Sequence, residues 1–124
     1  MTRPRATVEI TIDAEDPDVS AAFWQDALGY ERARHRDGYV VLSAPAGDPR
    51  PVLIIQRVDS VTPGKARVHM DLRVPDAGAE VQRLTGLGAT ALREVDETAQ
   101  GGSRWTVMVD PQGTVFCVCP AREE

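Results

Sequence analysis

The chain has 124 residues, of which 42% are hydrophobic and 27% charged, and its formal net charge is −5. This length suits one domain, and the interspersed charges form no basic stripe that would indicate a nucleic-acid partner. No apolar run reaches the roughly 18 residues of a membrane helix, and the first residues do not resemble a secretory signal. We therefore expect one domain over residues 1–124, located in the cytoplasm, with neither a nucleic-acid nor a membrane partner.

The first half of the chain predicts a strand, a helix and three further strands. Residues 7–14 alternate between apolar and polar side chains, which indicates a strand with one buried face. Asp16 is a favourable N-cap, Pro17 fits the first helical turn, and Gly29 is a natural helix end. The apolar positions of this helix are taken to be Val19, Ala22, Phe23 and Ala27. Further strands are expected at about 31–35, 38–43 and 52–58.

The same pattern restarts after a Pro-Gly linker at residues 60–65. Residues 67–74 alternate again, Asp76 is a second N-cap, and Gly88 ends a second helix. The apolar stripe of that helix is taken to be Val81, Leu84 and Leu87. The remaining strands are expected at 91–94, 104–109 and 114–119, with a turn at 110–113. Asp16 and Asp76 are sixty positions apart, so the chain is interpreted as an internal duplication with halves of about 7–58 and 67–119.

The duplication places chemically capable side chains at matching positions. Glu9 and His69 are also sixty positions apart, each on the polar face of the first strand of its half. Matching the turns before the two last strands places Gln56 opposite Cys117. If the strands curl into a cup, these four side chains converge on its inner wall. Cys117 lies two residues from Cys119, so both thiols share one strand face and are poorly placed for a disulfide.

Four more residues are candidates for contact with a ligand. Tyr39 and Trp105 lie on equivalent strands, where their rings are able to stack on a flat molecule. Asp71 and Arg73 share the polar face with His69 and suit a polar or anionic ligand. Structural roles stay open beside these: core packing for the aromatic residues, and ion pairing or hydrogen bonding for the charged ones.

Several segments, in this order and spacing, resemble the vicinal-oxygen-chelate superfamily of glyoxalase, bleomycin-resistance and dioxygenase proteins. They are Phe23-Trp24, Leu28-Gly29-Tyr30, Val68-His69-Met70-Asp71-Leu72, Leu84 with Leu87-Gly88-Ala89-Thr90, Trp105-Thr106-Val107 and residues 110–117. The resemblance implies an α+β fold in which two tandem βαβββ modules form a curved mixed sheet around a small-molecule cup. In the metal-binding relatives, one ligand comes from each of the four strands that here carry Glu9, Gln56, His69 and Cys117.

The chain departs from the family pattern at two points. Cys117 stands where metal-dependent glyoxalase I relatives have a carboxylate that binds the metal and helps to move the substrate proton. The ring-cleaving iron dioxygenases resemble a two-histidine, one-carboxylate pattern, and the second histidine here, His35, lies outside it. We therefore expect neither glyoxalase I nor iron dioxygenase activity. We expect no cofactor, and among metals zinc suits His69 and Cys117 best.

Three functions remain open at this point. We predict binding of a small organic molecule in the concave pocket, such as sequestration of an antibiotic or natural product. The alternative is a lyase or isomerase that uses Glu9 and His69 as an acid–base pair or as ligands of a divalent metal. The third possibility is a subunit with a vestigial pocket and a role in protein association. We also expect a homodimer, because the resembling proteins commonly pair and symmetric pairing covers apolar surface.

Overall fold

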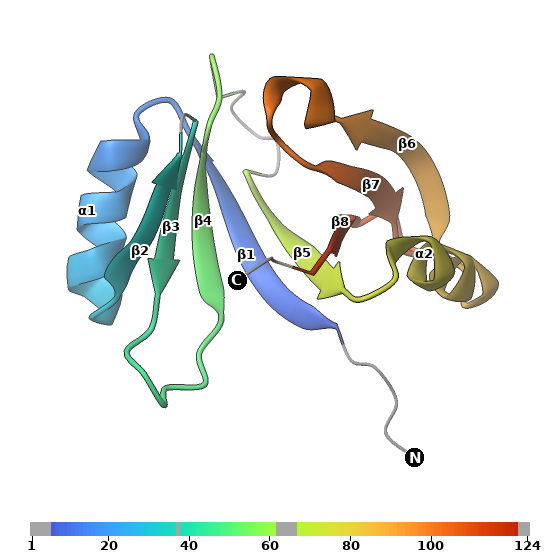
Figure 1. Ribbon diagram of the computed structural model, residues 1–124, viewed down its shortest axis with the longest axis horizontal. Coiled ribbons are helices and arrows are strands. Elements are labelled where there is room, and N and C mark those ends of the chain that lie inside the picture. The colour runs from blue at the N-terminus through green and yellow to red at the C-terminus, as the bar shows by residue number, and fades with distance from the viewer. Residues whose placement is uncertain (1–5, 37, 62–66, 122–124) are drawn as a thin grey trace. The chain divides into compact units, whose positions relative to one another are not determined.

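The computed structural model describes residues 6–36, 38–61 and 67–121 (Figure 1). The elements follow the chain in this order: β1 (Thr7–Ala14), α1 (Pro17–Leu28), β2 (Glu31–Arg36), β3 (Tyr39–Ser43), β4 (Val52–Arg57), β5 (Val68–Val74), α2 (Ala77–Gly86), β6 (Thr90–Asp96), the 3₁₀-helix η1 (Thr98–Gln100), β7 (Arg104–Val109) and β8 (Val115–Pro120). The predicted strands and helices are confirmed to within about two residues at most ends, whereas η1 was not predicted. Most of the predicted linker at 60–65 lies outside the described residues. Neither described α-helix is long and apolar enough to span a membrane.

The chain divides into two compact units, with divisions inside β1 between Val8 and Glu9 and inside β5 between His69 and Met70. We call β1–β4 with α1 the first module and β5–β8 with α2 the second module. Each module has the order strand, helix and three strands, which confirms the predicted α+β fold of two βαβββ modules.

Each module builds a mixed four-stranded arrangement. In the first module β1 runs parallel to β4, while β4 pairs with β3 and β3 with β2 in antiparallel fashion. In the second module β5 runs parallel to β8, while β8 pairs with β7 and β7 with β6 in antiparallel fashion. The strand orders are therefore β2-β3-β4-β1 in the first module and β6-β7-β8-β5 in the second, so corresponding strands occupy the same places in both modules.

The helix caps predicted from the sequence are present in both modules. The Asp16 carboxylate accepts a hydrogen bond from the Val19 backbone N–H at 3.4 Å, and Asp76 accepts one from the Ala79 N–H at 3.0 Å. Each satisfies a backbone donor that has no partner inside the first turn. Gly29 ends α1 with φ of 72°, a left-handed conformation that only glycine adopts without strain.

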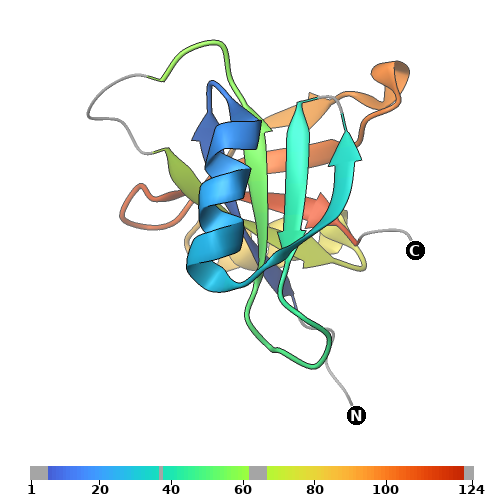
Figure 2. The same cartoon turned by 90° about the vertical axis from the view of Figure 1, so that its left-hand side faces the viewer.

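The helix α1 buries a different face from the one that the sequence suggested. Ala21 is fully buried, and Trp24 and Leu28 pack against the first core. Figure 2 shows α1 lying along one face of the strands of the first module. Val19 and Phe23 are 67% and 62% exposed, and Ala22 and Ala27 are exposed as well. The predicted stripe was therefore wrong: the face that packs on the strands carries Ala21, Trp24 and Leu28, which are spaced three and four residues apart as on one side of a helix. The buried members of this core are Ala14, Ala21, Tyr30, Val40, Leu42, Leu53 and Ile55.

The helix α2 follows its predicted stripe more closely. Val81 and Leu84 pack against the second core, which is formed by Val74, Met108, Phe116 and Val118. Leu87 is 66% exposed, because it forms the C-cap and lies beyond the last turn that faces the strands.

Strand alternation separates the two faces of each module. Ile10 and Ile12 of β1 pack on the α1 side, so Glu9 and Thr11 take the opposite face. Phe116 and Val118 of β8 pack on the α2 side, and Cys117 and Cys119 take the opposite face. We call the face opposite the helix of a module its helix-free face. All eight candidate site residues alternate onto the helix-free face of their own module.

Candidate functional site

The strand ends and helix caps define which positions of the two modules correspond. The strand β1 ends at Ala14 and β5 ends at Val74, and the caps Asp16 and Asp76 follow two residues later in each case. The sixty-residue offset therefore holds along the first strands, and Glu9 corresponds to His69 by this offset.

The predicted match between Gln56 and Cys117 is wrong. By the sixty-residue offset, Thr11 of β1 corresponds to Asp71 of β5. In the parallel pairs, Thr11 lies opposite Ile54 and Asp71 lies opposite Cys117. Cys117 therefore corresponds to Ile54 and not to Gln56. The loop before β4, residues 44–51, is longer than the loop before β8, residues 110–114, so matching the turns shifts the alignment of the last strands.

This register breaks the four-strand ligand set that the family resemblance implies. Ile54 has no atom that binds a metal, so the repeat supplies no fourth ligand on β4. Gln56 lies two residues further along β4, half-buried, with Asp13 and Tyr39 as its partners on the neighbouring strands. The four metal ligands that the family resemblance implies are therefore not all present in this chain. A role for Gln56 and Tyr39 in binding a small molecule stays a prediction.

Glu9 lies on β1, opposite Val52 of β4, and is only 2% exposed. A carboxylate buried to this extent needs polar partners, because an unpaired buried charge is costly. Its position on the helix-free face of the first module is the one that the alternation of residues 7–14 predicted.

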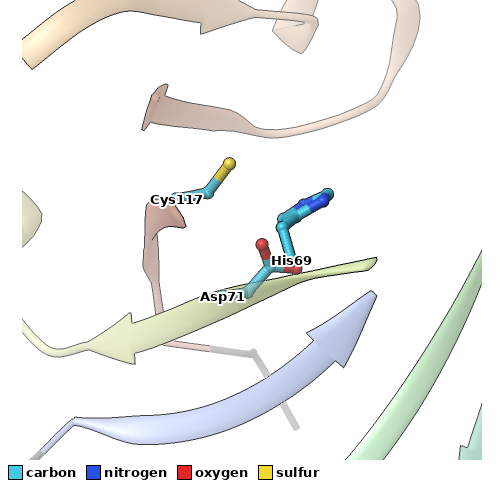
Figure 3. Close-up of side chains that lie close together, drawn as sticks. All are labelled: His69, Asp71 and Cys117. Carbon is cyan, nitrogen blue, oxygen red and sulfur yellow. The ribbon is translucent and has the colours of Figure 1, made fainter. Parts of the chain in front are cut away.

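The structure brings together three other groups: His69, Asp71 and Cys117 (Figure 3). The imidazole nitrogens, the carboxylate oxygens and Sγ each offer one ligand atom, and these atoms all lie within 4.8 Å of one another. His69 and Asp71 alternate along β5, and Cys117 is the direct partner of Asp71 on β8. His69 is half-buried, whereas Asp71 and Cys117 are 7% and 6% exposed.

Two of these three residues were metal candidates in the sequence, and the third was a ligand-binding candidate only. Asp71 was recognisable as a neighbour of His69, because residues i and i+2 of a strand share a face. The approach of Cys117 depends on the register between β5 and β8, which no local pattern in the sequence specifies. Glu9, another predicted metal ligand, is not a member of this group of described residues.

The environment of Cys117 keeps its thiol protonated. Burial raises the pKa of the Cys117 thiol to about 12, and the Asp71 carboxylate adds to the rise through its charge and by accepting a hydrogen bond from the thiol. The Arg93 guanidinium acts in the opposite direction but is outweighed. Since the thiolate is the nucleophilic form, Cys117 is unreactive near neutral pH in the metal-free protein.

Apolar and basic side chains complete this part of the helix-free face. Trp105 and Val95 pack, half-buried, against a cluster of Val107, Cys117 and Cys119. The Arg73 guanidinium donates a hydrogen bond to the Pro120 carbonyl at 3.2 Å, at the end of β8. The second module therefore presents an indole ring and a compact polar group on one face of its strands.

Comparisons with known proteins agree with this architecture. The glyoxalase-like domain family matches residues 9–119. A search of curated proteins gave no significant match. Among solved structures, the chain is similar to a glyoxalase/bleomycin resistance protein/dioxygenase superfamily member from Vibrio splendidus 12B01, with a TM-score of 0.63 and 20% identity over 93% of this chain and 98% of that one.

Two further solved structures have the same fold. Methylmalonyl-CoA epimerase from Mycobacterium tuberculosis gives a TM-score of 0.65 and 20% identity over 96% of this chain and 89% of that one. A structure described as NAD-dependent benzaldehyde dehydrogenase from Legionella pneumophila gives a TM-score of 0.68 and 12% identity over 93% of this chain and 99% of that one. Their described activities differ, and at such identities the likeness shows the fold alone.

The fold and the family match thus define the class: a protein with the architecture of the glyoxalase/bleomycin resistance/dioxygenase superfamily. Within it, this chain belongs to the glyoxalase-like domain family.

Proposed function

We propose that this protein binds a small organic molecule against the helix-free face of its second module and holds it without transforming it, as in sequestration of an antibiotic or natural product. The observation that carries the proposal is the polar group of His69, Asp71 and Cys117 beside the half-buried ring of Trp105. Small-molecule sites typically combine mostly apolar walls with a few polar groups that fix the orientation of the ligand.

The chemistry of the group supports binding better than covalent catalysis. The protonated Cys117 thiol is a poor nucleophile, so a thiolate attack on the bound molecule is disfavoured. The His69 imidazole and the Asp71 carboxylate are able to exchange hydrogen bonds with a polar ligand, and the Trp105 ring offers a stacking surface.

The proposal is tested by a thermal-shift screen of small organic molecules against the purified protein. A ligand that binds the folded state raises the melting temperature, and its affinity is then measured in the parent protein and in His69→Ala and Trp105→Ala. We expect both variants to bind more weakly, with a loss of roughly fivefold for Trp105→Ala because aromatic stacking is worth about 1 kcal/mol. Phe23→Ala is the matched control, since Phe23 is an exposed aromatic residue on α1. If both site variants bind every identified ligand as tightly as Phe23→Ala does, the proposed site is wrong.

An isomerase is the second candidate function, and the buried Glu9 carboxylate favours it. A carboxylate and an imidazole at repeat-related positions suit removal of a proton next to a carbonyl group by one residue and its return by the other. The presence of an epimerase among the solved structures of this fold agrees with such chemistry without assigning it.

Solvent exchange separates the two candidates. An isomerase of this kind incorporates deuterium from D₂O next to the carbonyl of a bound ligand, and Glu9→Gln or His69→Ala lowers this incorporation because each removes one of the two bases. Mass spectrometry of each ligand found in the screen measures this directly. Binding without deuterium incorporation supports sequestration, and incorporation that depends on Glu9 supports the isomerase.

A further inference from the structure

The edge strand β6 places an arginine on the helix-free face of the second module. In the antiparallel pair of β6 and β7, Arg93 lies opposite Val107, and Val95 lies opposite Trp105. Val95 and Trp105 pack against Val107 on the helix-free face, so Arg93, two residues from Val95, takes the same face. Arg93 is exposed, and its charge lowers the pKa of the Cys117 thiol against the larger effect of burial. A guanidinium therefore lies beside the proposed binding surface.

A β-bulge turns Arg93 toward this face. Ala91 lies opposite Met108, and the next paired residue of β6, Arg93, lies opposite Val107. Leu92 is therefore an extra residue in β6. With regular pairing Leu92 would lie opposite Val107, and Arg93 would take the side that carries α2. Bulges often re-aim a side chain next to a functional site, and this one directs a positive charge to the helix-free face.

The first module has the same arrangement. The register of β2 shifts directly before Arg34, which then lies opposite Val41 of β3. Because β3 and β7 are corresponding strands, and Val41 and Val107 pair with corresponding residues of β4 and β8, Arg34 corresponds to Arg93. Both halves of the chain thus use a bulge to direct an arginine to the helix-free face. The second module adds the Trp105 ring to it.

The carboxylates of β6 do not neutralise Arg93. Glu94 and Asp96 alternate onto the opposite face, where the Arg104 guanidinium of β7 lies 3.8 Å from the Glu94 carboxylate and 3.1 Å from that of Asp96. Among the residues that the structure describes, no carboxylate forms an ion pair with Arg93. A planar guanidinium without a counter-ion suits a carboxylate, which it binds through two parallel hydrogen bonds.

The position of Trp105 relative to Arg93 adds a second requirement on the ligand. The two residues are diagonal neighbours on β6 and β7, because Arg93 lies opposite Val107 and Trp105 lies opposite Val95. Diagonal neighbours are about 7–8 Å apart, within reach of aromatic and long side chains. A carboxylate attached to a flat ring is therefore able to pair with the guanidinium while the ring stacks on the indole.

The far side of the same face sets the length of the molecule. In the order β6-β7-β8-β5, Arg93 is separated from Asp71 by three strand spacings, or about 14 Å. A molecule about 8 Å long with a hydrogen bond of about 2.8 Å at each end spans this distance. Since β5 presents the Asp71 carboxylate and the His69 imidazole, a hydrogen-bond donor such as a hydroxyl group suits that end.

We propose that the molecule bound by the second module is a flat aromatic carboxylate, with its carboxylate paired to Arg93, its ring on Trp105 and a hydrogen-bond donor at its far end directed to β5. This inference rests on the proposed binding function and adds the chemical class of the ligand. Arg93 is a specificity-determining residue in this arrangement, and it lies outside the polar group of His69, Asp71 and Cys117.

Binding of 6-hydroxy-2-naphthoic acid to the whole protein, followed by equilibrium dialysis near neutral pH, tests the proposal. The probe is flat, with a carboxylate at one end and a hydroxyl group at the other. We expect its uncharged methyl ester to bind roughly tenfold more weakly, because a hydrogen bond to a charged group typically contributes a factor of ten or more. Arg93→Met keeps the apolar stem of the side chain, and it should weaken binding of the acid by roughly tenfold and leave binding of the ester unchanged.

Arg104→Met is the matched control, because it removes an exposed arginine from the other face of the same hairpin and should bind the acid as the parent does. The proposal is overturned if the parent does not bind the acid, if it binds acid and ester equally, or if Arg93→Met and Arg104→Met bind the acid equally. Failure of the proposed function has a different signature, in which no molecule from the thermal-shift screen loses affinity in His69→Ala and Trp105→Ala. Neutral ligands that do lose affinity in those variants, together with equal binding of acid and ester, keep the function and overturn the carboxylate alone.

Discussion

At the scale of single residues, the reactivity of the Cys117 thiol depends on the groups around it. A cysteine on a strand is by default a small buried apolar residue. Here burial raises the pKa of the thiol, and the Asp71 carboxylate on the neighbouring strand β5 adds to the rise through its charge and a hydrogen bond from the thiol. The residue is therefore a poor nucleophile near neutral pH.

We predict that Cys117 resists alkylation by iodoacetamide in the folded, metal-free protein at pH 8. A thiol with a pKa of about 12 is ionised to only about one part in 10⁴ at that pH, whereas a cysteine with the ordinary pKa of 9.0 is ionised to about a tenth. Asp71→Asn removes the neighbouring negative charge and should raise the labelling rate, as measured by mass spectrometry of the peptide that contains Cys117. Equal rates in the parent and Asp71→Asn would show that the carboxylate does not act on this thiol.

The raised pKa of the Cys117 thiol also determines whether stability rises or falls with pH. The folded pKa of about 12 lies above the ordinary value of 9.0, so the unfolded chain releases this proton at lower pH than the folded protein does. The contribution of Cys117 to stability is therefore fully present below pH 9 and is lost as the pH rises toward 12. Chemical unfolding of the parent and of Cys117→Ala across this range should show a shallower decline in the variant.

At the scale of elements, the two helices are placed by short local signals. The caps, the left-handed Gly29 and the alternation of β1 and β5 act within a few residues of the chain, which is why the sequence predicts them well. The face that each helix buries depends on what the opposing strands present, and there the prediction for α1 was wrong.

We predict that Asp16→Ala and Asp76→Ala each lower the free energy of unfolding by about 1 kcal/mol, the usual cost of losing an N-cap. The loss should be greater for Asp76, whose hydrogen bond to the Ala79 N–H is 3.0 Å, than for Asp16, whose bond to the Val19 N–H is 3.4 Å. Urea unfolding measures both. The control is Asp26→Ala on the exposed surface in the last turn of α1, which should be neutral or slightly stabilising because an acidic residue is unfavourable at that end of a helix. A similar loss in all three variants would argue against a capping effect.

At the scale of the whole molecule, we retain the prediction of a homodimer. Several large apolar side chains are exposed on the described surface, including Val19, Phe23, Leu87 and Leu92, and symmetric pairing is the commonest way to cover such surface. Sedimentation velocity at tens of micromolar, an order-of-magnitude choice for a specific dimer, should give the mass of two chains. A monomer at these concentrations would contradict the prediction.

The duplicated chain shows where sequence reasoning succeeds and where it ends. The sequence by itself determined the two βαβββ modules, the helix caps and the alternation that puts His69 and Asp71 on one face of β5, because these follow from period-two and helical spacing. Only the tertiary structure decided that Cys117 lies opposite Asp71, that Gln56 does not correspond to Cys117, and that α1 buries Trp24 and not Phe23. The physical reason is that strand register and helix rotation are set by loop lengths and by packing between segments distant in the chain, neither of which is written in a local pattern.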